Sequence, residues 1–244
     1  MDVQHAPQTT IQLATGVELK GFLEGTEQAQ GLIVFVHGSG SSRFSVRNNQ
    51  VAQFLRSNGF ATLLMDLLTT SEDQRDAMTR ELRFNIPLLA ERVARTLDWL
   101  AKHESVGELP IGLFGASTGA AAALIAAASQ PTRVRAVVSR GGRPDLAGEV
   151  LTAVRTPTLL IVGGADTQVL RLNQVAMGRI PAETQLVIVP GATHLFEETG
   201  TLELVAQHAA DWFKQHLGAH SRGGYTKPVN ATQPRSAPAP GTDY

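Results

Sequence analysis

Cysteine is absent from the 244-residue sequence. This absence excludes disulfide bonds, thiolate metal ligands and a cysteine nucleophile. An excess of one charge is also lacking, because 21 basic residues nearly balance 22 acidic ones. We therefore expect no binding to nucleic acid and no attraction to an anionic membrane surface.

Long apolar runs are missing as well. The longest, residues 120–128, is about half the length that a membrane-spanning helix needs. The first residues lack the basic segment followed by an apolar stretch that marks a signal peptide. These observations predict a cytoplasmic protein that does not enter a membrane.

Short apolar runs alternate with helical patterns along most of the chain. The runs 9–13 and 17–23 predict an antiparallel hairpin. The alternation that follows predicts an α/β fold, with a mostly parallel sheet of about eight strands and helices on both faces. Further strands are expected at 32–36, 60–64, 111–114, 134–138, 158–162 and 185–189. Helices are expected at 46–58, 86–103, 120–128, 145–154, 169–177 and 201–217, and the polar segment 69–76 is expected to be a loop.

The composition changes near residue 218, where proline, glycine and small polar residues replace the apolar pattern. Residues 1–217 are therefore predicted to form one domain, and residues 218–244 a disordered tail or linker. Inside the domain the longest connection, 67–83, is charged and small. Only a minimal lid is expected, unlike the large apolar lid of a lipase.

One turn motif suggests nucleophilic catalysis. The stretch Gly115-Ala116-Ser117-Thr118-Gly119 lies between an apolar strand and an alanine-rich helix. This order is typical of a nucleophile elbow, in which a serine occupies a strained turn in front of a helix N-terminus. The glycines let the strand and the helix approach closely. The motif alone is also compatible with an ordinary glycine-flanked turn.

An acid and a base follow the serine in chain order. Asp166 and His194 each come shortly after a buried strand, at the sheet edge where Ser117 is expected. These positions predict a Ser117–His194–Asp166 triad. Two alternatives stand beside this prediction: Asp166 could serve only as a helix cap, and Asp145 is a rival acid.

A glycine-rich loop, His37-Gly38-Ser39-Gly40-Ser41-Ser42, follows the strand 32–36. The backbone N–H groups of Ser39 and Thr118 are predicted to form an oxyanion hole. His37 is expected to support the loop by hydrogen bonding. A phosphate-binding loop is disfavoured because the P-loop lysine and a Gly-x-Gly-x-x-Gly motif are both missing.

Several arginines are expected near the mouth of this site. Arg140 and Arg143 follow the strand 134–138, and Arg43 follows the glycine-rich loop, as does Arg47. Together with His37 and Gly38, the residues Arg43, Arg140 and Arg143 are predicted to contact substrate. Arginines could bind a carboxylate or phosphate by forked hydrogen bonds. The alternative is that they pair with surface carboxylates such as Asp145, Glu72 or Asp73.

These motifs together resemble the α/β-hydrolase superfamily over residues 9–217. The short chain and small lid are similar to its dienelactone-hydrolase-like branch. The stretches 37–43 and 139–145 resemble a serine-nucleophile subgroup, some members of which are joined to phosphoribosyltransferase domains. Dienelactone hydrolases proper carry a cysteine at the elbow, whereas this chain carries Ser117. The resemblance therefore implies a serine esterase-like mechanism.

The expected function is a serine hydrolase that cleaves a small ester, lactone or related acyl substrate through an acyl-enzyme. No metal ion and no organic cofactor is expected, and the expected partner is a small molecule, with an anionic one as an option. Acyl transfer to another acceptor and lyase chemistry on the same triad are alternatives. A non-catalytic or regulatory binding module is another. The oligomeric state is left open.

Overall fold

A computed structural model describes residues 7–14 and 16–218 of the chain. The tail predicted for 218–244 lies, apart from Gly218, outside the described residues. The described part contains one eight-stranded sheet, so the predicted α/β class and strand number are confirmed. The strands are β1 (Thr9–Ala14), β2 (Val17–Glu24), β3 (Leu32–Val36), β4 (Ala61–Met65), β5 (Ile111–Ala116), β6 (Val134–Arg140), β7 (Thr158–Gly163) and β8 (Thr184–Val189).

The strand order is β1-β2-β4-β3-β5-β6-β7-β8. Strand β2 pairs antiparallel with both β1 and β4, and every pair from β4 onward in this order is parallel. The hairpin predicted at the N-terminus is therefore confirmed. Because the parallel strands point the same way, their carboxyl ends share one edge of the sheet, where ligands bind in folds of this kind.

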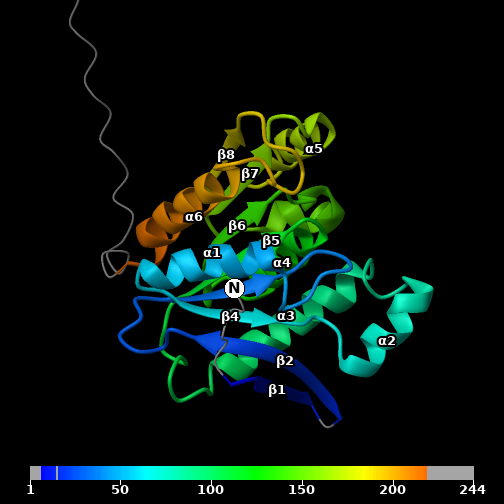
Figure 1. Ribbon diagram of the computed structural model, residues 1–244, viewed down its shortest axis with the longest axis vertical. Helices are drawn as coiled ribbons and strands as arrows, with labels where there is room; N and C mark the ends of the chain where they lie inside the picture. The colour runs from blue at the N-terminus through cyan, green and yellow to red at the C-terminus, as the bar shows by residue number, and fades with distance from the viewer. Residues whose placement is uncertain (1–6, 15, 219–244) are drawn as a thin grey trace, which may run out of the picture.

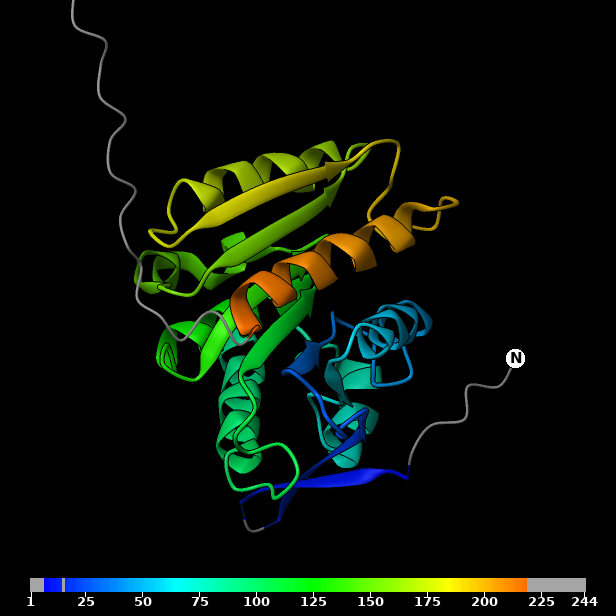
Figure 2. The ribbon, with the colours of Figure 1, turned by 90° about the vertical axis from the view of Figure 1, so that its left-hand side faces the viewer.

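Helices cover both faces of the sheet, as Figures 1 and 2 show. They are α1 (Val46–Ser57), α2 (Thr70–Thr79), α3 (Ile86–Leu100), α4 (Thr118–Ser129), α5 (Thr167–Met177), α6 (Thr201–Leu217) and the 3₁₀ helix η1 (Pro144–Ala153). Helices α1 and α6 pack on one face, and α3, α4, α5 and η1 on the other. In Figure 2 the yellow strand β8 separates the orange helix α6 from α5.

Strand β3 shows how one strand serves two cores. Its residues are all buried, with Ile33 and Phe35 in the cluster that contains α1 and α6. Leu32, Val34 and Val36 belong to the cluster on the opposite face. Side chains alternate across a strand, so a strand covered on both faces must be apolar at every position.

The prediction of a loop at residues 69–76 is wrong, because this segment forms most of α2. Thr69 caps the helix: its hydroxyl accepts from the Glu72 backbone N–H, and the Glu72 carboxylate accepts from the Thr69 N–H. This reciprocal capping box stabilises the first turn of a helix that is largely polar. The pattern Thr-x-x-Glu was visible in the sequence, but the segment has too few apolar residues for a helical period.

The described residues include no helix that is both long enough and apolar enough to cross a membrane.

The capping box gives a testable effect on stability. Removal of an N-cap hydroxyl typically costs about 1 kcal/mol. We expect Thr69→Ala to lower the free energy of unfolding by about that amount in urea titrations. The matched control is Thr70→Ala, which removes an exposed hydroxyl one residue later and should change stability by less. Equal effects of the two substitutions would contradict the capping role.

Candidate active site

Ser117 lies between the end of β5 and the start of α4, with φ 50° and ψ −122°. Such a conformation costs energy in a residue with a Cβ atom. Backbone hydrogen bonds hold it in place: the Ser117 N–H donates to the Arg140 carbonyl at 3.2 Å, and the Arg143 N–H donates to the Ser117 carbonyl at 3.0 Å. The end of β6 and the residues that follow it therefore fix the turn that presents the Ser117 hydroxyl.

The glycines of the motif allow close packing around this turn. A Cβ atom on Gly119 would lie 2.2 Å from the Val36 carbonyl oxygen and 2.4 Å from that of His37. A Cβ atom on Gly115 would lie 2.5 Å from the Ala120 Cα. Only glycine permits helix α4 to approach β3 and β5 this closely.

The structure brings Ser117, His194 and Asp166 together. His194 Nδ1 lies 2.7 Å from Asp166 Oδ2, and His194 Nε2 lies 3.4 Å from Ser117 Oγ. The Asp166 side chain is 15% exposed and the His194 side chain 38%. The imidazole is thus oriented by a mostly buried carboxylate while its other nitrogen faces the hydroxyl.

Asp166 uses its two carboxylate oxygens for different partners. Oδ2 contacts His194, while Oδ1 accepts from the Val169 N–H at 3.3 Å and caps helix α5. The cap and the contact with histidine are therefore compatible. The rival acid Asp145 is instead held by two hydrogen bonds from the Arg143 guanidinium, at 2.8 and 2.9 Å.

The loop that carries His194 has its own support. The Thr193 N–H donates to the Glu198 carboxylate at 3.1 Å. Hydrogen bonds, above all those from Thr193, hold the pKa of Glu198 below its usual range. Gly141 packs against the same loop, where an added Cβ would lie 2.9 Å from the His194 carbonyl oxygen.

The glycine-rich loop lies directly against the elbow. The Ser39 N–H donates to the Thr118 hydroxyl oxygen at 2.9 Å, so this predicted oxyanion donor has a partner in the free protein. A Cβ atom on Gly38 would lie 3.0 Å from the Ser117 Cβ. The Thr118 N–H belongs to the first turn of α4, where backbone donors have no partner within the helix.

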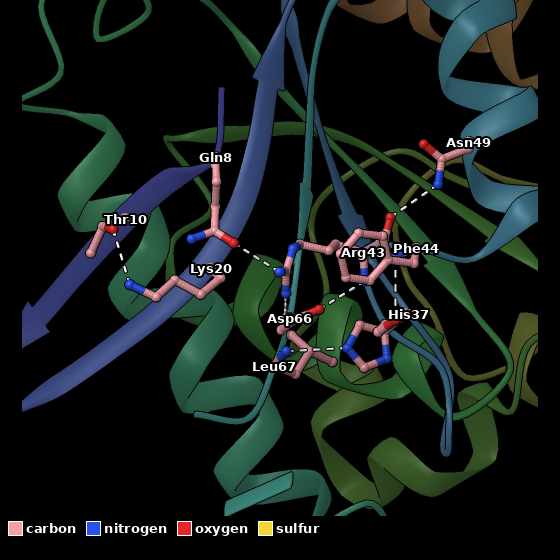
Figure 3. A network of polar contacts seen from close by, with 10 residues as sticks. Gln8, Thr10, Lys20, His37, Arg43, Phe44, Asn49, Asp66 and Leu67 are labelled. Carbon is pink, nitrogen blue, oxygen red and sulfur yellow. Dashed lines mark hydrogen bonds and ion pairs between the residues drawn. The ribbon is translucent and has the colours of Figure 1, made fainter. Parts of the chain in front are cut away.

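His37, the first residue of this loop, contacts Leu67, as Figure 3 shows. Its ring is buried, with Nδ1 2.9 Å from the Gly38 carbonyl oxygen and Nε2 3.1 Å from the Leu67 nitrogen. The neutral ring satisfies both contacts when Nδ1–H donates to Gly38 and Nε2 accepts from the Leu67 N–H. Burial lowers the pKa of His37 and outweighs the contrary effects of the Gly38 hydrogen bond and nearby carboxylates. His37 thus supports the loop, as expected, and does not line the hollow at Ser117.

Two of the predicted arginines are paired with carboxylates. Arg43 forms an ion pair with Asp66, donates to Gln8 and lies over the Phe44 ring, as Figure 3 shows. Arg143 is bound to Asp145. Neither residue is among those that line the hollow at Ser117. The pairing alternative therefore describes both of these guanidinium groups.

Arg140 does line that hollow, which has a volume of about 250 Å³. Ser117, His194 and Gly38 contribute to its wall, together with Arg47, Asn48 and other residues. No sequence pattern pointed to Asn48. It is a buried polar residue in the first turn of α1, and burial of that position was not readable from the sequence. Among the described residues, no cluster of three or more histidine or acidic side chains could hold a metal ion.

The environment of His37 predicts a dependence of stability on pH. Its folded-state pKa lies below the ordinary value of 6.5, so the unfolded chain binds more protons in the interval between the two values. Stability is therefore fully present above pH 6.5 and falls as the pH drops toward the folded-state pKa. The variant His37→Gln has no ionisable group at this position, so it lacks this contribution to the pH dependence. We expect wild type to lose up to about 1.4 kcal/mol more stability per pH unit than the variant in that interval. Urea unfolding at pH 7.5 and 5.5 measures the difference, and equal losses would contradict it.

Comparison with known proteins agrees with this geometry. A family model described as "alpha/beta hydrolase fold" matches residues 31–198. The crystal structure of a dienelactone hydrolase from Anabaena variabilis is 50% identical, with a TM-score of 0.84 over 86% of this chain and 96% of that one. Est1E from Butyrivibrio proteoclasticus is 15% identical, with a TM-score of 0.72 over 87% of this chain and 99% of that one, a likeness of fold alone.

A relative from Mycobacterium tuberculosis strain H37Rv is 56% identical over 208 residues. It is provisionally named a phosphoribosyl transferase. The match covers 85% of this chain but only 46% of the relative, so the chain spans about half the length of the curated protein it matches. The family match covers most of the sheet and the site, and we conclude that the chain belongs to the α/β-hydrolase family and is similar to dienelactone hydrolase.

Proposed function

We propose that the protein is a serine hydrolase that cleaves a small ester, lactone or related acyl substrate through an acyl-enzyme. The observation that carries this proposal is the line of contacts from Asp166 through His194 to Ser117, at 2.7 and 3.4 Å. A nucleophile, a base and a group that orients the base are the parts that acyl transfer requires. The similarity to a dienelactone hydrolase at 50% identity supports hydrolysis as the reaction class.

In the first step, His194 Nε2 takes the proton from the Ser117 hydroxyl as Oγ attacks the substrate carbonyl. Asp166 keeps the imidazole in the tautomer with a proton on Nδ1 and stabilises the imidazolium that forms. His194 then protonates the leaving alcohol, and the carbon–oxygen bond to it breaks. In the second step, water attacks the acyl-enzyme with His194 as base, which releases the acid and restores Ser117.

The negative charge on the carbonyl oxygen needs donors during both steps. We assign this role to the backbone N–H groups of Thr118 and Ser39. The Ser39 N–H is bound to the Thr118 hydroxyl in the free protein, but an oxyanion is a stronger acceptor than a neutral hydroxyl. Ser39 would therefore change its partner when the oxyanion forms. Each such donor is typically worth about 3 kcal/mol in the transition state.

The curated relative is named a phosphoribosyl transferase, so a transferase activity has to be assigned to one part of that relative. The matched segment of 208 residues is less than half of that relative. In this chain the glycine-rich loop lacks the lysine of a phosphate-binding P-loop. We therefore assign hydrolysis to the segment that this chain shares, and any transferase activity to the remainder of the relative.

The proposal predicts that Ser117→Ala and His194→Ala abolish hydrolysis of p-nitrophenyl acetate and butyrate. Loss of the nucleophile reduces kcat on the order of 10⁶-fold in a mature triad enzyme, so both variants should fall to background. The measurement is the steady-state release of p-nitrophenol. A serine-directed phosphonate should label wild type stoichiometrically and leave Ser117→Ala unlabelled. Equal traces from all three proteins, with no labelling of wild type, would overturn the proposal.

The oxyanion assignment predicts a defect in Gly38→Ala. The added methyl group would lie 3.0 Å from the Ser117 Cβ and from the Ala116 carbonyl oxygen, which displaces the loop that carries the Ser39 N–H. We expect kcat to fall about 10- to 100-fold, since loss of one oxyanion donor costs about 10²- to 10³-fold. Gly178→Ala is the matched control, because its nearest neighbour would lie at an ordinary 3.6 Å. A Gly38→Ala enzyme with the kcat of the control would contradict the assignment.

A further inference from the structure

Arg140 is a buried cation beside the nucleophile. The residue is 6% exposed, and its Nη2 donates to the Asn48 side-chain oxygen at 3.0 Å. Its Nε is buried and has no hydrogen-bond partner among the described residues. Asn48 is neutral, and a buried guanidinium without a counter-ion is costly. The fold therefore holds an unneutralised positive charge at this point.

A second cation faces the same hollow. Arg47 lines it together with Arg140, and the Nε of Arg47 is also buried and unpartnered among the described residues. Burial, together with the charge of Arg47, lowers the pKa of Arg140 to about 10. Arg47 pairs with Glu197 at 3.1 Å, but the Glu197 side chain is 62% exposed and screened by water. The described residues that line this hollow include no carboxylate.

The cavity on the other side of the glycine-rich loop has a different character. It has a volume of about 210 Å³ and shares Gly38, Ser39 and Ser41 with the hollow at Ser117. Its acidic residues are Asp66, Asp73 and Asp76, and its arginines Arg43 and Arg83 are paired with two of them. In this cavity both arginines are paired with carboxylates, whereas the hollow at Ser117 is lined by two arginines and by no carboxylate of the described residues.

We propose that Arg140 and Arg47 form an anion subsite, and that the substrate is a small acyl compound with a carboxylate or phosphate close to the scissile bond. The subsite refines the proposed hydrolase function. The assignment of the bound anion as part of a substrate rests on that function. Arg140 lies beside the elbow because it pairs in register with Ala116, the residue before Ser117. An anion in the hollow would supply the counter-charge and the acceptors that the two Nε–H groups lack.

The test compares esters that match in shape and differ in charge. Monomethyl succinate and methyl 3-phosphonopropanoate carry an anion in the acyl part, where methyl 4-methylpentanoate carries a branched alkyl group. Acetoxyacetate carries a carboxylate in the leaving group, where isobutyl acetate carries the alkyl group. Hydrolysis is followed in a pH-stat. We expect kcat/KM for at least one anionic ester to exceed that of its neutral match by about 30-fold or more. The three anionic esters distinguish carboxylate from phosphate and the acyl side from the leaving side.

The variants assign this preference to particular residues. Arg140→Gln keeps a polar group that can reach Asn48 but removes the charge, and it should lower the anionic-to-neutral ratio about 30- to 100-fold. Arg47→Gln, at a side chain that is 36% exposed, should lower the ratio about 3- to 10-fold and provides a test if Arg140→Gln does not fold. Arg143→Gln is the matched control, because Asp145 already neutralises that guanidinium and the ratio should stay within about twofold.

A thermal-shift titration with inorganic phosphate and monomethyl succinate tests the subsite without turnover, on the Ser117→Ala background with and without Arg140→Gln. Stabilisation that depends on Arg140 supports the subsite even if no ester is hydrolysed, whereas failure of phosphonate labelling counts against the hydrolase alone. Hydrolysis of neutral esters at the rate of their anionic matches, or the absence of any shift that depends on Arg140, would overturn the subsite.

Discussion

The strained turn at Ser117 is the constraint on which the site depends. Its positive φ persists because the end of β6 and the residues after it hold the backbone, through the Arg140 carbonyl and the Arg143 N–H. The glycines around it let α4 start next to β3 and β5. Sheet pairing and helix packing therefore together determine the position of Ser117. Strain of this kind is stable only where the surrounding structure determines it completely.

The same strand ends bring the remaining groups to the turn. Strand β5 leads to Ser117, β7 leads to Asp166, and β8 leads to His194, all at the carboxyl edge of the sheet. Strand β6, between β5 and β7, ends in Arg140. The sheet order thus places a cation next to Ser117, on the strand between those that lead to Ser117 and Asp166. The buried His37 stabilises the glycine-rich loop at this edge through its contacts with the Gly38 carbonyl oxygen and the Leu67 N–H.

Sequence reasoning succeeded where a residue's role follows from its place along the chain. Continuous apolar runs predicted strands such as β3, β4, β5 and β7, which are buried at every position, and alternating runs predicted the hairpin of β1 and β2. It failed at α2, since capping by Thr69 and Glu72 stabilises a polar helix that shows no apolar period. It also treated the arginines as equivalent. Arg43 and Arg143 lie within reach of Asp66 and Asp145, whereas the Arg140 side chain meets neutral Asn48, a residue 92 positions away.

The sequence by itself determined the α/β class, the strand order along the chain, the serine turn and the order of serine, acid and histidine. These features depend on local pattern, turn chemistry and the rule that parallel strands end at one edge. The tertiary structure alone decided which carboxylate faces His194, where the Ser39 N–H is directed and which arginine is left without a counter-charge. Such outcomes depend on distances of a few ångströms between segments far apart in the chain, and local pattern does not encode them.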